Sequence, residues 1–370
     1  MRGTWGLLSR LAFAGLVATS LVAGIAGGLV RAGVAAPVAG ATVVAHAFLM
    51  ICAFMGTVIA IERAVAVKRA VAFAGPLASG AAGLALLARA PQVAAWLAAA
   101  AALAFVCVNV VVVRRQKAIH TLLLLAGAVA WAGGSLLHAL DVLAGAVVPL
   151  WFCFLLFTIA AERLEMTRLM RRQAVAGPAL LGILAAAACG ALLSGFAPGW
   201  GGGLYGLSLA ALAAWLVTFD IARRTVRTAG LSRYMALCLL TGYAWLFAAG
   251  LAWAATAQGL PWRDMALHAL ALGFVFSMVL GHAPVILPAV ARVKVAFGWP
   301  FYLPLGLLHA SLAVRLLGGH LDPRLTAAGA AGNALAVAAF AITLAASAIA
   351  WRARHAPDQR KPRHDTLAGN

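Results

Sequence analysis

Charged residues are scarce in this chain, and acidic residues are the scarcest of all. Only 10% of the 370 residues are charged and nine are Asp or Glu, whereas 65% are hydrophobic. An ordinary soluble domain has about 25% charged residues, and a soluble core cannot absorb this much apolar surface. Acidic residues such as Glu62, Glu162 and Asp220 stand at the ends of apolar runs. This placement weakens the case for a proton- or sodium-coupled pump built on carboxylates at the membrane centre.

Paired cysteines are missing as well. The five cysteines stand singly within apolar runs, without a Cys-x-x-Cys pair, and their number is odd. We therefore interpret them as reduced packing residues.

Long apolar runs are what the sequence has in abundance. Windows of about 19 residues, the length that crosses roughly 30 Å of hydrocarbon, select about twelve spans. The spans must be helices, because an unpaired backbone is costly in lipid and no alternating pattern of about ten residues indicates barrel strands. They lie near residues 11–30, 41–61, 72–88, 93–113, 119–139, 142–161, 174–195, 203–221, 235–256, 265–287, 298–316 and 328–351. The sequence thus predicts an all-α, polytopic membrane helical bundle over residues 1–351.

The basic residues predict the orientation of this bundle. A formal charge of +19 would suggest a nucleic-acid partner in a soluble chain, but here Lys and Arg form short clusters between apolar runs, so we expect a lipid bilayer and no nucleic acid. All of the 28 basic residues fall on one side except Arg31, Arg89, Arg263, Arg315 and Arg324. The rich side is assigned to the cytoplasm together with both termini and the basic tail, 352–370. The long first apolar run favours a retained helix over a cleaved signal peptide.

Two parts of the sequence resemble each other. Glu62–Arg63 at the end of the second span matches Glu162–Arg163 at the end of the sixth, and Gly75–Pro76 similarly matches Gly177–Pro178. We predict a duplicated four-helix unit, spans two to five and six to nine, whose copies keep the same orientation because four helices separate equivalent positions.

Histidines are the ionisable residues of the predicted spans, and such residues are functional candidates by default. The topology places His46, His138, His268 and His309 in the outer half of the membrane. Neutral imidazole binds zinc, copper and haem iron, so four rings at one level predict a shared site for one or two metal centres. For each ring alone, the alternative is interhelical hydrogen bonding or a position at the membrane surface. This alternative fits His138 best, because His138 ends its span next to Asp141.

A fifth histidine, His282, shares a span with His268. Their separation of 14 residues gives a rise of about 21 Å and a rotation of about 40° in a regular helix. A helix of cytochrome b spaces the ligands of two stacked haems similarly, and His120 is a candidate partner for His282. Pro284 and Pro288 follow directly, so we predict a helix interruption here that lines a cavity.

Together these stretches resemble the NnrS family, twelve-helix bacterial membrane proteins that contain haem and copper and are associated with nitric oxide and nitrosative stress. The likeness rests on Ala45–Phe48, His268–Phe274, Gly281–Pro284 and Leu308–His309. The chain resembles a divergent member, since Ala47 and Phe48 follow His46 where the family has a His-Glu-Met-like run. The resemblance implies a bacterial cytoplasmic (inner) membrane and ligation of haem b or copper by His46, His268, His282 and His309.

Our leading hypothesis is therefore a membrane haem protein, with copper as a further candidate, that handles nitric oxide or a related redox ligand and receives electrons from a membrane or periplasmic donor. Whether it turns over a substrate stays open. The alternative is a metal-free transporter or permease for a small solute, with the segment from His282 to Pro288 lining its path.

Overall fold

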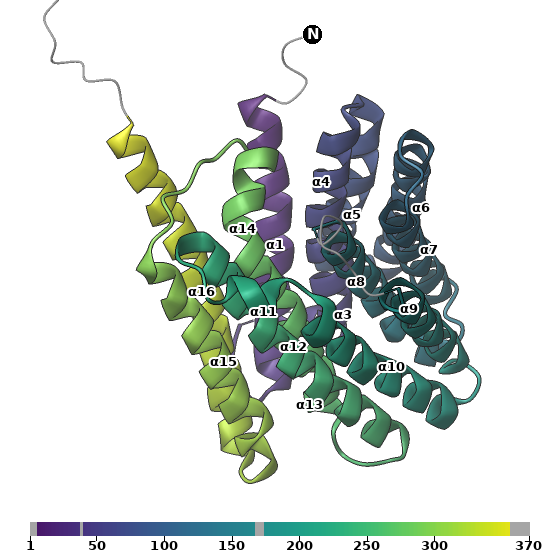
Figure 1. The fold of residues 1–370 in the computed structure, drawn as a ribbon. Helices are drawn as coiled ribbons and strands as arrows, with labels where there is room; N and C mark the ends of the chain where they lie inside the picture. Colours follow the sequence, from purple (N-terminus) through teal and green to yellow (C-terminus); the bar gives the residue numbers. More distant parts are fainter. Residues whose placement is uncertain (1–5, 38–39, 167–173, 356–370) are drawn as a thin grey trace, which may run out of the picture.

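The computed structural model describes residues 6–37, 40–166 and 174–355, and these residues form a helical bundle (Figure 1). Twelve helical stretches are long and apolar enough to cross a membrane, and no strand occurs within the described ranges. Each overlaps one of the twelve predicted spans, so the predicted fold class is confirmed. The helices form where apolar residues run on for 18 or more positions, because only intrahelical hydrogen bonds satisfy such a backbone in lipid.

The spans vary in regularity. Single helices form the first, fourth to ninth and last spans, whereas the second and tenth each contain a stretch of π-helix. In chain order the spans are α1 (Leu7–Arg31); α3 (His46–Phe48), η1 (Leu49–Met55) and α4 (Gly56–Val67); η2 (Ala70–Phe73) and α5 (Ala74–Leu87); α6 (Pro91–Arg115); α7 (Ile119–Ala139); α8 (Ala144–Met166); α9 (Ala176–Leu193); α10 (Pro198–Phe219); α12 (Gly230–Ala257); α13 (Arg263–His268), η3 (Ala269–Phe276) and α14 (Ser277–Val290); η4 (Trp299–Phe301), α15 (Tyr302–Leu316) and η5 (Gly318–His320); and α16 (Pro323–Arg354). Two short helices, α2 (Gly40–Val44) and α11 (Ala222–Thr225), lie outside them.

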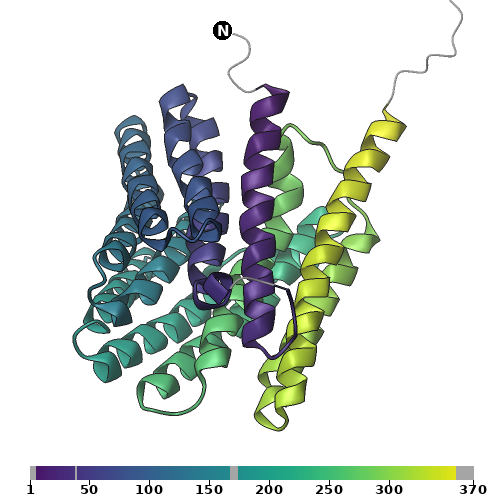
Figure 2. The same ribbon diagram turned by 180° about the vertical axis from the view of Figure 1, so that it is seen from behind.

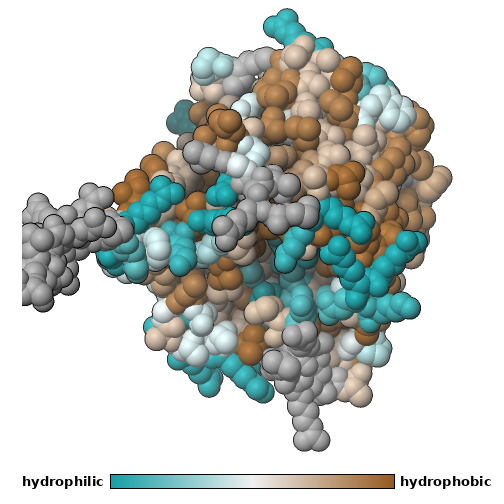
Figure 3. Space-filling view, turned by 90° about the horizontal axis from the view of Figure 1, so that it is seen from above, coloured by the Kyte–Doolittle hydropathy of each residue, from teal (hydrophilic) through white to brown (hydrophobic). Residues whose placement is uncertain are grey.

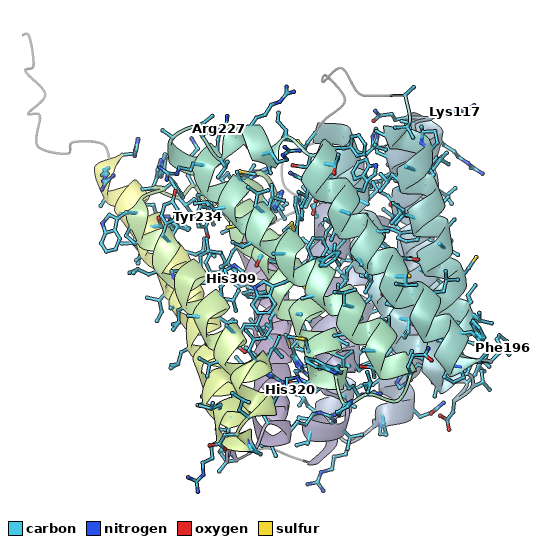
Figure 4. All side chains as sticks on the ribbon, turned by 60° about the horizontal axis from the view of Figure 1, so that its bottom comes forward. Lys117, Phe196, Arg227, Tyr234, His309 and His320 are labelled. Carbon is cyan, nitrogen blue, oxygen red and sulfur yellow. The ribbon has the colours of Figure 1, made fainter. Side chains whose placement is uncertain are left out.

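The two ends of the bundle differ in their side chains. Helix α1 begins and α16 ends at the same end of the molecule (Figures 1 and 2). Lys117 and Arg227 lie toward this end, Phe196 and His320 toward the other, and His309 between them (Figure 4). Seen from above, this end carries many hydrophilic side chains (Figure 3). We call it the basic end and the opposite one the outer end. Helix α16 continues three residues beyond the predicted limit at 351, and residues 356–370 of the predicted tail lie outside the described ranges.

Consecutive helices pack on each other in both of the predicted four-helix units. In the first unit α5, α6 and α7 each pack on the next, and in the second α9, α10 and α12 do the same. Helix α8, which begins the second unit, packs on both α7 and α9 and is the most buried span. Its central position explains its many buried aromatic residues, since few of its faces contact lipid.

The predicted interruption at the two prolines was wrong. Helix α14 continues through Pro284 and Pro288 to Val290. Each proline removes one backbone hydrogen bond, but its fixed φ suits a helix, and neighbouring helices support such positions in membranes. The irregular part of this span lies upstream, in the π-helix η3.

Close contact between α10 and α12 depends on two glycines. A Cβ at Gly206 would lie 2.5 Å from the Gly250 carbonyl oxygen and from the backbone nitrogen of Ala254. We expect Gly206→Ala to lower stability by about 1–3 kcal/mol, because backbone atoms cannot yield to the added methyl group. Thermal unfolding of the purified protein in detergent measures this. Gly182→Ala is the matched control, since a Cβ there meets nothing within 4 Å, and equal unfolding midpoints for the two variants would contradict the packing argument.

Candidate functional site

A cavity of about 600 Å³ lies between the first and last spans and the two spans that contain π-helix. Its walls are mostly apolar and come from α1, α3 with η1, α8, α13 with η3, and α16. Residues of both π-helices line it, among them Met50 and Phe54 of η1 and Leu272 and Phe276 of η3. π-Helical turns are rare and occur often at functional sites. The cavity volume is within the range of small-molecule and cofactor sites, about 300–1,000 Å³.

His46 lines this cavity at the start of the second span, and α1 determines how its ring lies. The Nδ1–H group of His46 donates to the Gly24 carbonyl oxygen at 2.6 Å. The ring rests against Gly28, where a Cβ would come within 2.7 Å of its Cε1 atom. Glycine at position 28 therefore makes room for the imidazole, and the carbonyl of Gly24 fixes its orientation and leaves Nε2 as the available nitrogen.

His268 lies beside His46, as the depth argument predicted. The two ring centroids are 6.1 Å apart and the ring planes differ by 26°. The Nδ1 atom of His268 is 2.8 Å from a carboxylate oxygen of Asp264, one helical turn earlier. Arg315 Nη2 lies 3.2 Å from both nitrogens of the ring. His268 thus contacts a carboxylate and a guanidinium that are also bonded to each other.

Arg315 and Asp264 form the strongest polar contact of the site. Two parallel hydrogen bonds join them, Nε to Oδ2 at 2.9 Å and Nη2 to Oδ1 at 2.7 Å, and only 8% of Arg315 is exposed. Charge-assisted bonds of this forked kind are short and directional. Arg31 and Arg263 also line the cavity, whereas Asp264 is the one carboxylate among the described lining residues. The polar side of the cavity therefore carries positive charge and suits an anionic group.

His309 stands apart from this site. Its Nδ1 accepts a hydrogen bond from Trp245 Nε1 at 2.9 Å, and its Nε2 lies 3.0 Å from the Thr241 hydroxyl. That hydroxyl already donates to the Leu237 carbonyl, so Nε2–H donates to it. Both nitrogens are engaged and His309 is not a lining residue of the cavity. The ring fastens α15 to α12.

The remaining predicted histidines also lie elsewhere. His138 is exposed at the end of α7, with Phe48 and Trp151 against its ring. His282 lies at the other end of the tenth span from His268, where its Nδ1 contacts the Met278 carbonyl and its Nε2 lies 2.8 Å from Arg163 Nη2. Its contact is thus Arg163 rather than the suggested partner, His120, which lies 4.0 Å from Glu165.

Of the predicted set, the structure thus brings together two imidazoles, those of His46 and His268. Within the described ranges, no three His, Cys, Asp or Glu side chains form a group that could hold a metal ion. A metal that is already held by a ring of its own, as iron is in haem, needs only one or two further ligands, and two histidines could supply them.

Three residues of the site were missed by the sequence analysis: Gly28, Asp264 and Arg315. The spacing of Asp264 and His268, four residues apart, was a usable signal, because such residues share a helix face. Arg315 was counted as an outer-side charge, and nothing in its neighbourhood shows that it turns inward to Asp264. Gly28 is one of 38 glycines, and only the fold distinguishes it.

Comparison with known proteins gives a family without a function. Residues 10–349 match the family described as "Domain of unknown function (DUF8744)". The chain belongs to this family, since the match covers almost all of its spans. No curated protein and no solved structure matches the chain.

The pair formed by Asp264 and Arg315 can be tested by substitution. We expect Arg315→Gln to lower stability by about 1.5–3 kcal/mol, because Asp264 and His268 lose a charged hydrogen-bond partner. Arg315→Lys should recover only part of this, since an ammonium group cannot make the forked contact. Thermal unfolding midpoints measure both effects.

The double variant Asp264→Asn with Arg315→Gln serves as the control for direct coupling. Its loss of stability should be smaller than the sum of the two single losses, because residues in contact are not additive. Strictly additive losses would show that the two side chains do not act as a pair.

Proposed function

We propose that this chain is a haem protein of the bacterial cytoplasmic membrane, with both termini in the cytoplasm, and that it handles nitric oxide or a related redox ligand. His46 and His268 hold the haem in the cavity near the outer end. The orientation is supported by the basic residues, nearly all of which the sequence assigns to one side.

One observation carries this proposal: the pair of imidazoles at the cavity wall. Two imidazoles that bind one metal ion through bonds of about 2 Å have ring centres roughly 4.5–6.3 Å apart, depending on the angle between the bonds, and those of His46 and His268 are 6.1 Å apart. Metal-binding histidines usually donate the other ring N–H to a carbonyl or carboxylate. His46 does so to Gly24, and the Nδ1 atom of His268 contacts Asp264 in the same way.

The two histidines differ in whether their Nε2 atom is free to bind a metal ion. Nε2 of His46 has no hydrogen bond within the described part of the chain, whereas Nε2 of His268 is 3.2 Å from Arg315. His46 would therefore be the first ligand of the haem, and His268 would be the second, once its Nε2 is released from Arg315. Resemblance to the NnrS family supports ligation of haem or copper at both positions.

The cavity suits the rest of a haem. Its apolar walls match the porphyrin ring of a haem. The guanidinium groups of Arg31, Arg263 and Arg315 can pair with the two carboxylate groups that a haem carries. We propose haem rather than copper as the resident group, because haem iron needs only one or two protein ligands, and no group of three candidate ligands occurs in the described ranges. When bound, the iron would supply ligand binding and electron transfer.

Optical spectroscopy of the purified full-length protein tests this. We expect a Soret band and about one iron per chain, strong loss of both in His46→Ala and weakened or altered binding in His268→Ala, because the ligands are removed. His138→Ala is the matched control and should keep the wild-type spectrum, since its ring lies outside the cavity. Nitric oxide should shift the band of the reduced protein.

Wild-type protein without a Soret band and without stoichiometric iron would overturn the proposal. So would spectra of His46→Ala and His268→Ala that equal that of wild type. Solute uptake by metal-free proteoliposomes would instead support the transporter alternative.

A further inference from the structure

A second group of charged residues lies at the basic end, remote from the cavity. Arg63 Nη2 lies 3.1 Å from Glu162 Oε1 and 3.4 Å from Glu62 Oε1. The Glu-Arg pairs of the two repeats therefore interlock, and one guanidinium serves a carboxylate from each repeat. Both Glu-Arg pairs are visible in the sequence, but the contact between them is visible only in the structure.

Arg163 extends this group into the bundle. It is 4% exposed, and its Nη2 lies 2.8 Å from Nε2 of His282, whose Nδ1–H donates to the Met278 carbonyl at 2.7 Å. The His282 ring is thus neutral and accepts from the guanidinium. Arg163 also interacts electrostatically with Glu162 and with Asp220.

Asp220 is the one carboxylate of this group without an ion pair. It follows the end of α10 and is 5% exposed. Its Oδ1 accepts from the Ala222 amide at 2.7 Å, whereas its buried Oδ2 has no hydrogen-bond partner. Among the ion pairs of the described residues none includes Asp220. A buried carboxylate in this position would leave charge uncompensated, which is costly.

The hydroxyl group of Tyr243 lies close to this carboxyl. Tyr243 is fully buried, and its hydroxyl interacts with Asp220 without forming a well-shaped hydrogen bond. Two buried polar atoms of neighbouring side chains, Oδ2 of Asp220 and the phenol oxygen of Tyr243, therefore keep spare hydrogen-bonding capacity. Such atoms in a native protein call for a ligand or a proton between them.

Among the residues that the structure describes, carboxylates outnumber guanidinium groups in this group. Glu62, Glu162 and Asp220 are three carboxylates, whereas Arg63 and Arg163 are two guanidinium groups. Burial raises the pKa of Asp220 above its ordinary value of about 3.8, although Arg163 and the Ala222 amide oppose the shift.

We propose that Asp220 is a proton-binding site at the basic end of the bundle, with Tyr243 as its hydrogen-bonding neighbour. At neutral pH the carboxyl is protonated on Oδ2. On release the Oδ2–H bond breaks, the proton passes to water at the basic end, and the carboxylate that remains accepts from the Tyr243 hydroxyl. The site is independent of any haem, because the charged group meets the tenth span at His282, which lies at the other end of that span from His268.

Infrared spectroscopy of the full-length protein in detergent or nanodiscs tests this. We expect a protonated-carboxyl C=O band at neutral pH that shifts in D2O, disappears at high pH and is absent in Asp220→Asn. Glu162→Gln and the exposed Glu165→Gln are the matched controls and should keep the band. Absence of the band in wild type at neutral pH, or its persistence in Asp220→Asn, would overturn the proposal.

Stability as a function of pH gives a second, independent measurement. An acid whose folded pKa is raised loses its stabilising contribution as pH rises from the unfolded value, about 3.8, to the folded value. The unfolding midpoint of Asp220→Asn relative to wild type should therefore rise across this interval. A difference that stays constant with pH would mean that Asp220 does not bind a proton on folding.

Discussion

Every backbone group that lies in hydrocarbon must find its hydrogen-bond partner within the chain, and this constraint shapes the whole protein. It makes each apolar run a helix and leaves little room for irregular structure. The two π-helices, η1 and η3, are the exceptions that the constraint allows, because they keep the backbone bonded while they change its winding. Both follow directly after histidine-bearing turns, α3 with His46 and α13 with His268, and both line the cavity. The candidate site therefore lies where two spans change from α-helix to π-helix.

The parts of the fold that depend on length and depth could be predicted from the sequence. Twelve spans, their approximate limits and the meeting of His46 with His268 at one level all follow from apolar run length and chain direction. The face that a side chain presents does not follow, because packing decides it. His309 was predicted at the same level, but its ring contacts Trp245 and Thr241. The 40° rotation between His268 and His282 assumed a regular helix, and the π-helix η3 between them changes that angle.

Buried charge explains the contacts that the sequence did not reveal. An arginine near a membrane span must find a partner, because an unpaired charge in a dry environment is costly. Arg315 therefore turns inward to Asp264, and this ion pair places a carboxylate against His268. Arg63 of the second span forms an ion pair with Glu162 of the sixth span. Both partners come from distant parts of the chain, 51 and 99 residues away, so no local pattern could have shown them.

Three spans that lie four apart in the chain contribute residues to both polar regions of the bundle. The second, sixth and tenth spans all line the cavity at the outer end, the sixth through Val148, Phe152 and Leu155. The same three spans reach the charged group at the basic end, with Glu62, Glu162 and His282 respectively. The second and tenth share a plan of histidine, π-helix and charged-group residue, whereas the sixth, α8, lacks both the histidine and the π-helix and fills the centre. Spans that lie four apart in the chain cross the bundle in the same direction and can therefore place corresponding residues at similar depth. The histidines of the second and tenth spans lie side by side at one end, and the Glu-Arg pairs of the second and sixth spans meet at the other, so the length of the bundle separates the two polar regions.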